Sequence, residues 1–133
     1  MSRMTSRTAV LGVALVAAAG TATPALAAPA RATTLSLTVA RTSVAHNQRD
    51  PITGTLDAGR TPLRGKRVLL EKKASGARSF TQAGSATTDS RGQVHFSPVV
   101  GTRRGERVQY ELVFPGDSGD RASRSRVVTV SVT

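Results

Sequence analysis

Cysteine and tryptophan are absent from this 133-residue chain, and its aromatic residues are one tyrosine and three phenylalanines. The lack of cysteine excludes disulfide bonds and zinc sites built from thiolates. The scarcity of aromatic side chains leaves out the stacking platforms on which proteins hold single-stranded nucleic acid. The core must therefore consist mainly of aliphatic residues, with Phe80, Phe96, Tyr110 and Phe114 as its large members.

Residues that could carry chemistry are also few. His46 and His95 are the only histidines, whereas a metal site needs three or four converging ligands. The turn Gly-Asp-Ser-Gly at residues 116–119 is similar to the nucleophile segment of trypsin-like serine proteases. Asp120 follows it where that family has glycine, and the chain is too short for the two barrels of that fold. We therefore expect no catalytic residue, no metal and no cofactor.

The first 27 residues have the features of a secretory signal peptide. Arg3 and Arg7 precede an uncharged apolar stretch at residues 9–20, and the segment ends in Ala25-Leu26-Ala27. The apolar stretch is about a dozen residues long, shorter than the roughly 20 that cross a bilayer as a helix. We predict cleavage after Ala27, no membrane span in the mature chain, and a secreted, extracellular protein.

The chain is strongly basic, with 19 lysines and arginines, 8 acidic residues and a formal net charge of +11. Outside a cell, such a protein meets anionic partners, including wall polymers, lipopolysaccharide, DNA and acidic surfaces. Arginine greatly outnumbers lysine, so the charge also fits a compositional bias that gives a solvated surface without a defined partner. The sequence leaves both interpretations open.

Apolar and polar residues alternate with a period of two throughout the rest of the chain, and no window shows helical spacing. This pattern predicts seven strands, at residues 35–39, 52–56, 67–73, 80–88, 94–96, 108–114 and 128–132. Short alternating strands without a covering helix favour two packed sheets. We predict an all-β fold with one sandwich domain at residues 34–133, preceded by a flexible leader at residues 28–33.

Five segments of this domain carry distinctive turn and core sequences. They are residues 52–56 (ITGTL), 61–71 (TPLRGKRVLLE), 87–92 (TTDSRG), 110–117 (YELVFPGD) and 123–125 (SRS). In these segments the domain resembles the immunoglobulin-like domains of secreted and surface proteins of actinobacteria. The resemblance extends over residues 34–133 and implies an immunoglobulin-like β-sandwich. Such domains commonly occur in tandem arrays, whereas this chain holds one copy.

In an immunoglobulin-like topology, the first, third and fifth connections between strands meet at one end of the domain. That end gathers seven basic residues against Asp50 and Glu106, whereas the other end carries six basic and four acidic residues. The first end is therefore the better candidate for contact with a polyanion. Its basic residues are Arg41, Arg49, Lys72, Lys73, Arg78, Arg103 and Arg104.

Strands 67–73 and 108–114 are expected to be neighbours. On their outer face we predict opposite charges across the strands, from Arg67, Glu71, Arg107 and Glu111. The hydroxyl of Tyr110 is expected to bond to nearby backbone.

The leading hypothesis from the sequence is a secreted, non-catalytic binding or structural module of the bacterial cell envelope. Its basic end would contact anionic wall polymer or another polyanion. The alternative is a protein–protein interaction module that self-associates or binds a partner protein through an edge strand. The candidate edges are the first and last strands, 35–39 and 128–132, because no proline blocks them.

Overall fold

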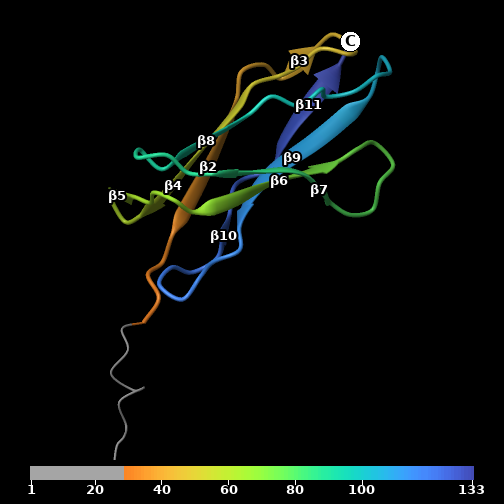
Figure 1. Ribbon diagram of the computed structural model, residues 1–133. Helices are drawn as coiled ribbons and strands as arrows, with labels where there is room; N and C mark the ends of the chain where they lie inside the picture. The colour runs from red at the N-terminus through yellow and green to blue at the C-terminus, as the bar shows by residue number, and fades with distance from the viewer. Residues whose placement is uncertain (1–28) are drawn as a thin grey trace, which may run out of the picture.

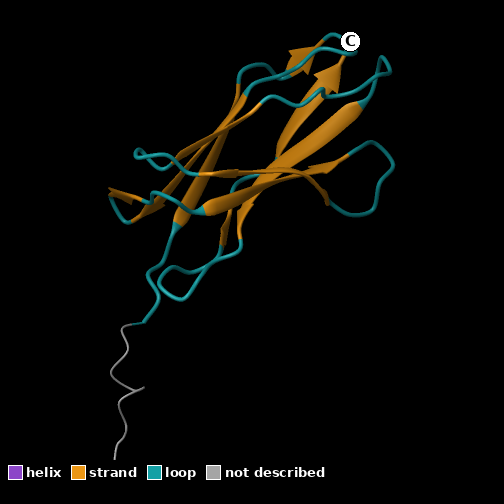
Figure 2. Cartoon of the chain, viewed as in Figure 1, coloured by secondary structure: helices purple, strands orange, loops and turns teal. Residues whose placement is uncertain are grey.

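Residues 29–133 are described by a computed structural model in which every regular element is a β-strand (Figures 1 and 2). The all-β prediction is confirmed for this part of the chain, and the predicted signal peptide, residues 1–27, lies outside it. The described residues include no helix that could span a membrane. The strands are β2 (Thr34–Val39), β3 (Ser43–Val44), β4 (Ile52–Ala58), β5 (Thr61–Pro62), β6 (Arg67–Lys73), β7 (Thr81–Thr87), β8 (Gln93–Phe96), β9 (Arg107–Phe114), β10 (Ser123–Arg124) and β11 (Val128–Val132).

Seven of these strands lie where the alternation predicts them, and the other three contain two residues each. A tight turn joins the end of β4 to β5, and β5 pairs only with β4. β3 and β10 are short pairings within longer connections. A two-residue strand shows no alternation, so the sequence pattern does not reveal it.

The strands form two sheets. In the larger sheet the order is β3-β11-β9-β6-β7, and β10 also pairs with β9. In the smaller sheet the order is β2-β4-β5, and β8 also pairs with β4. β3 and β11 run parallel, and the other strand pairs of these two sheets are antiparallel. β2 is an edge strand as predicted, and the outer edge of β11 is paired with β3 only at Ser131 and Val132.

One hydrophobic core lies between the two sheets, consistent with a β-sandwich. Its buried residues come from the inward positions of both sheets and are mostly aliphatic. Gly54 in β4 belongs to the inward-facing set, and a Cβ atom there would collide with Leu112 Cδ1 and lie 3.0 Å from Val94 Cγ2. Glycine at this position therefore lets the sheets approach closely. Among the predicted large core residues, Tyr110 and Phe114 are buried, whereas Phe80 and Phe96 are only half-buried.

Two polar side chains lie in this core without complete hydrogen bonding. Asp50 and Tyr110 both have an exposed fraction of 0%. Asp50 Oδ1 accepts a hydrogen bond from the Arg41 backbone N–H at 3.0 Å, but Asp50 Oδ2 and the Tyr110 hydroxyl have no partner within the described residues. The predicted bond from Tyr110 to backbone is therefore not formed. Burial raises the pKa of Asp50, and burial together with the Asp50 charge raises the pKa of Tyr110 to about 12.

The segment predicted to be a flexible leader is attached to the domain in its described part. The Arg31 N–H donates to Gly119 O at 2.9 Å, and the Arg121 N–H donates to Arg31 O at 2.8 Å. Thr33 Oγ1 donates to Arg121 O at 2.8 Å. Composition suggested a free segment, but backbone pairing with residues 119–121 holds it beside the connection between β9 and β10.

Candidate functional site

The end of the molecule that carries the seven predicted basic residues is called the basic end here. Hydrogen bonds join the connections between strands at this end. The connection from β2 to β4 is bonded to the connection from β8 to β9, because the Asn47 N–H donates to Gly101 O at 2.8 Å and the Asp50 N–H donates to Pro98 O at 3.1 Å. On its other side, the connection from β6 to β7 is fixed by Ser75, which bonds to the backbone of Arg107. The connection from β8 to β9 therefore lies between the other two.

Arg41 and Arg49 are exposed, and their guanidinium groups cap backbone carbonyls. Arg41 Nη2 donates to Arg49 O at 3.1 Å, and Arg49 Nη1 donates to Ser97 O at 2.6 Å. These bonds fix the two arginines against the surface, and neither side chain forms an ion pair within the described residues. Each guanidinium keeps further N–H donors that an anion can use.

Arg103 and Arg104 are exposed in the tip of the connection between β8 and β9. Glu106, the nearest carboxylate along the chain, accepts hydrogen bonds at Oε1 from the backbone N–H groups of Thr102 and Arg103, at 3.1 and 3.0 Å. The carboxylate thus shapes the loop and forms no ion pair with either arginine side chain.

Lys72, Lys73 and Arg78 lie on the other flank of the basic end. Lys73 Nζ is 5.7 Å from the centroid of the Phe80 ring, within the range of a cation–π contact. Arg78 is exposed in the loop between β6 and β7, and Lys72 is half-buried at the end of β6. The seven predicted residues therefore share one end of the molecule but spread over two flanks, with Arg103 and Arg104 between them.

Within residues 29–133, none of these seven basic side chains forms an ion pair. The two carboxylates at the same end, Asp50 and Glu106, accept hydrogen bonds from backbone N–H groups and offset only part of this charge. The basic end therefore carries an excess of positive charge, which attracts and orients polyanions.

At the opposite end, part of the charge is paired. Lys66 Nζ lies 2.6 Å from Asp117 Oδ2 and 3.0 Å from Asp120 Oδ2, and Arg31 Nε lies 2.9 Å from Asp120 Oδ1. The hydrogen bonds from Lys66 lower the pKa values of Asp117 and Asp120, and these two carboxylates raise the pKa of Lys66. Asp89 also has a lowered pKa, because its carboxylate accepts the backbone N–H groups of Gln93 and Arg91.

The outer face of β6 and β9 differs from its predicted arrangement. Glu71 stands directly opposite Glu111, so that like charges face each other across the strands. Arg124 on β10 compensates both, with Nη1 at 2.6 Å from Glu111 Oε1 and 3.8 Å from Glu71 Oε1. Arg67 pairs with Thr87 on β7, away from β9. The prediction failed because Glu71 would have to stand opposite Arg107, four residues from its observed partner Glu111, and side-chain alternation does not specify the register.

The histidines and the Gly-Asp-Ser-Gly turn do not converge. His46 Nδ1 lies 3.3 Å from Thr133 O, and His95 Nδ1 lies 3.4 Å from Thr53 Oγ1. In the turn, Asp117 Oδ1 accepts the backbone N–H groups of Gly119 and Asp120, so this aspartate closes a loop. No cluster of three potential metal ligands occurs in residues 29–133.

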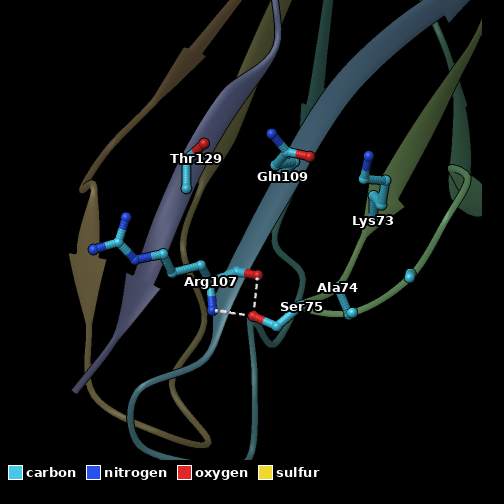
Figure 3. Close-up of a pocket in the computed structure, with 8 residues that line it drawn as sticks. Lys73, Ala74, Ser75, Arg107, Gln109 and Thr129 are labelled. Carbon is cyan, nitrogen blue, oxygen red and sulfur yellow. Dashed lines mark hydrogen bonds between the residues drawn. The ribbon is translucent and has the colours of Figure 1, made fainter.

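A small pocket of about 270 Å³ lies on the outer face of the larger sheet, beside the basic end (Figure 3). Its lining includes Lys73, Ser75, Arg107, Gln109 and Thr129. Of these residues, only Lys73 is among the candidate site residues predicted from the sequence. The others come from three further parts of the chain, and only the pairing of β6, β9 and β11 brings them together.

Comparison of the chain with known protein families gave no match, and neither did comparison with curated protein sequences.

Proposed function

We propose that this protein is a secreted, non-catalytic binding module of the bacterial cell envelope, whose basic end contacts polyanions. The observation that carries the proposal is the excess of positive charge at that end: seven basic side chains without an ion pair within residues 29–133, against the carboxylates of Asp50 and Glu106. Clusters of arginine and lysine of this kind bind phosphate and carboxylate groups.

The proposal includes an immunoglobulin-like fold related to the surface domains of actinobacteria. Its support is the segment resemblance together with the strand order. The first, second and fifth long strands (β2, β4, β8) share one sheet, and the third, sixth and seventh (β6, β9, β11) share the other. β7 pairs with β6 in the larger sheet, a variation in which the fourth strand joins the third rather than the smaller sheet. Export rests on the signal-peptide features of residues 1–27.

The test is binding of the purified protein, expressed from its full-length sequence, to isolated cell walls, anionic wall polymer and DNA across a salt series. Polyanion binding releases counterions, so the logarithm of the association constant should fall steeply with the logarithm of the salt concentration. Replacing Lys72, Lys73, Arg103 and Arg104 by glutamine should weaken binding and flatten that slope by roughly 3 if all four contact the polymer.

A matched control removes the same charge from the opposite end, by replacing Arg60, Arg64, Arg91 and Arg121 with glutamine. All four are exposed and form no ion pair within the described residues. The proposal requires this control to bind much more tightly than the first variant. Equal loss in both variants would mean that only total charge matters. Absence of binding by the unmodified protein would redirect the search to a protein partner at an edge strand.

A further inference from the structure

The pocket beside the basic end has a regular architecture. Lys73 on β6 stands opposite Gln109 on β9, and Gln109 stands opposite Thr129 on β11. The three side chains form one row across three adjacent strands on the outer face of the larger sheet. Neighbouring strands lie about 4.8 Å apart, so the row is roughly 10 Å long. Arg107, opposite Ser131, lies one position further along the same face.

The loop between β6 and β7 closes one side of this row. Ser75 Oγ donates to Arg107 O at 2.9 Å and accepts the Arg107 N–H at 2.8 Å. These two bonds, drawn in Figure 3, fix the loop against the start of β9 and make a concave wall of Ala74, Ser75 and Gly76. Strand pairing and the bonds of Ser75 therefore position the residues that line the pocket.

The two cations of the pocket do not converge on one point. In Figure 3, Lys73 lies on one side of Gln109, and the guanidinium of Arg107 extends away on the β11 side. In this arrangement the two cations face different parts of the pocket, so a chain with spaced anionic groups could contact each of them with a separate group. Neither cation forms an ion pair within residues 29–133.

Between the cations, the floor of the pocket is polar and uncharged. The Gln109 amide and the Thr129 hydroxyl form no side-chain hydrogen bond among the described residues, so both can bond to a ligand. An amide and a hydroxyl recognise hydroxyl groups, because each both donates and accepts. No aromatic side chain lines the pocket, so the stacking surface that nucleic-acid bases require is missing.

We infer that this pocket binds one unit of an acidic glycan, a hydroxyl-rich sugar or polyol chain that carries carboxylate or phosphate groups at intervals. Lys73 and Arg107 hold successive anionic groups, and Gln109 and Thr129 bond to the hydroxyl groups between them. The volume of about 270 Å³ is at the lower end of small-molecule sites, which suits a single unit of a longer chain. The inference rests on the proposed polyanion binding and names the class of polymer.

The experiment replaces Gln109 by leucine and Thr129 by valine, which removes the hydrogen bonds without changing charge. The control replaces Gln93 by leucine and Thr55 by valine, the same residue types standing opposite each other on β8 and β4 of the smaller sheet. The probes are polygalacturonate, which carries carboxylates, poly(glycerol phosphate), which carries phosphates, inorganic polyphosphate, which has charge without hydroxyl groups, and a DNA duplex. Affinities are compared at one salt concentration.

The inference predicts that the Gln109/Thr129 variant loses roughly tenfold in affinity for the acidic glycan that the unmodified protein binds more tightly. Its binding of polyphosphate and the affinities of the control variant should not change. The tighter-bound glycan identifies the anionic group as carboxylate or phosphate.

Three results would overturn the inference. If the variant binds both glycans like the unmodified protein while loss of the basic-end charges still abolishes binding, the pocket is not used but the proposed function stands. If polyphosphate or DNA binds more tightly than either glycan, the hydroxyl groups are not recognised. If the unmodified protein binds none of the probes, the inference and the proposed function both fail.

Discussion

Replacing Asp50 by asparagine should make the protein more stable at neutral pH. Asp50 is completely buried, and only one of its carboxylate oxygens has a hydrogen-bond partner within the described residues. A buried polar atom left without a partner costs about 1–3 kcal/mol, and more if it is charged. Asparagine keeps an oxygen to accept the Arg41 N–H, removes the charge, and places an N–H donor in the region of the unpartnered Tyr110 hydroxyl.

We expect a gain of about 1–2 kcal/mol in the free energy of unfolding at pH 7, equivalent to a rise in Tm of roughly 4–10 °C for a domain of this size. Urea unfolding followed by circular dichroism measures it. Asp57→Asn is the matched control, because Asp57 is half-exposed at the end of β4 and should change stability little. A clear loss of stability in the Asp50 variant would show that the carboxylate is fully bonded in solution.

The dependence of the free energy of unfolding on pH is a second test of the role of Asp50. Burial raises the folded-state pKa of Asp50 above its ordinary value of 3.8. The folded state therefore binds this proton more tightly than the unfolded state, and its contribution to stability is lost as the pH rises from 3.8 through the raised pKa. The advantage of the asparagine variant should grow over that window and then stay constant. An advantage independent of pH would refute the assignment to Asp50.

Two further substitutions test the packing and the outer face. Gly54→Ala should destabilise the protein by about 1–3 kcal/mol in urea unfolding, because the added Cβ collides with Leu112. Gly84→Ala is the control and should be tolerated, because its Cβ would meet only Phe96, at 3.6 Å. Equal effects of the two substitutions would argue against close packing at Gly54. Arg124→Gln should destabilise by about 1–2 kcal/mol, because it leaves Glu111, whose side chain is only 8% exposed, opposite Glu71 without compensation. Adding Glu111→Gln should restore most of the loss, and no restoration would exclude repulsion between the glutamates as the cause.

The positions of the long strands could be predicted from the sequence because side-chain alternation is a local property. Val108, Tyr110, Leu112 and Phe114 occupy every second position along β9, and the structure buries all four. The same locality explains the turn at Asp89, whose carboxylate accepts the backbone N–H groups of Arg91 and Gln93.

Cross-strand partners could not be predicted, because they depend on register. The pairing of β6 with β7 shifts between Leu70 and Glu71, and the same strand places Glu71 opposite Glu111. Neither feature has a local sequence signal, so the role of Arg124 and the row of Lys73, Gln109 and Thr129 were both missed. The loop charges, by contrast, could be assigned to one end of the domain from an assumed strand order alone.

The pairing of Arg31 with Asp120 also determines through which end the protein should be attached to a surface. The chain enters the sandwich beside the connection between β9 and β10, whereas Thr133 is bonded to Val44 and His46 at the basic end (Figure 1). A surface or fusion partner attached before residue 29 therefore leaves the basic end facing outward, free to meet a large polymer. Attachment after Thr133 places the added group against that same end, so binding measurements on immobilised protein should use the first orientation.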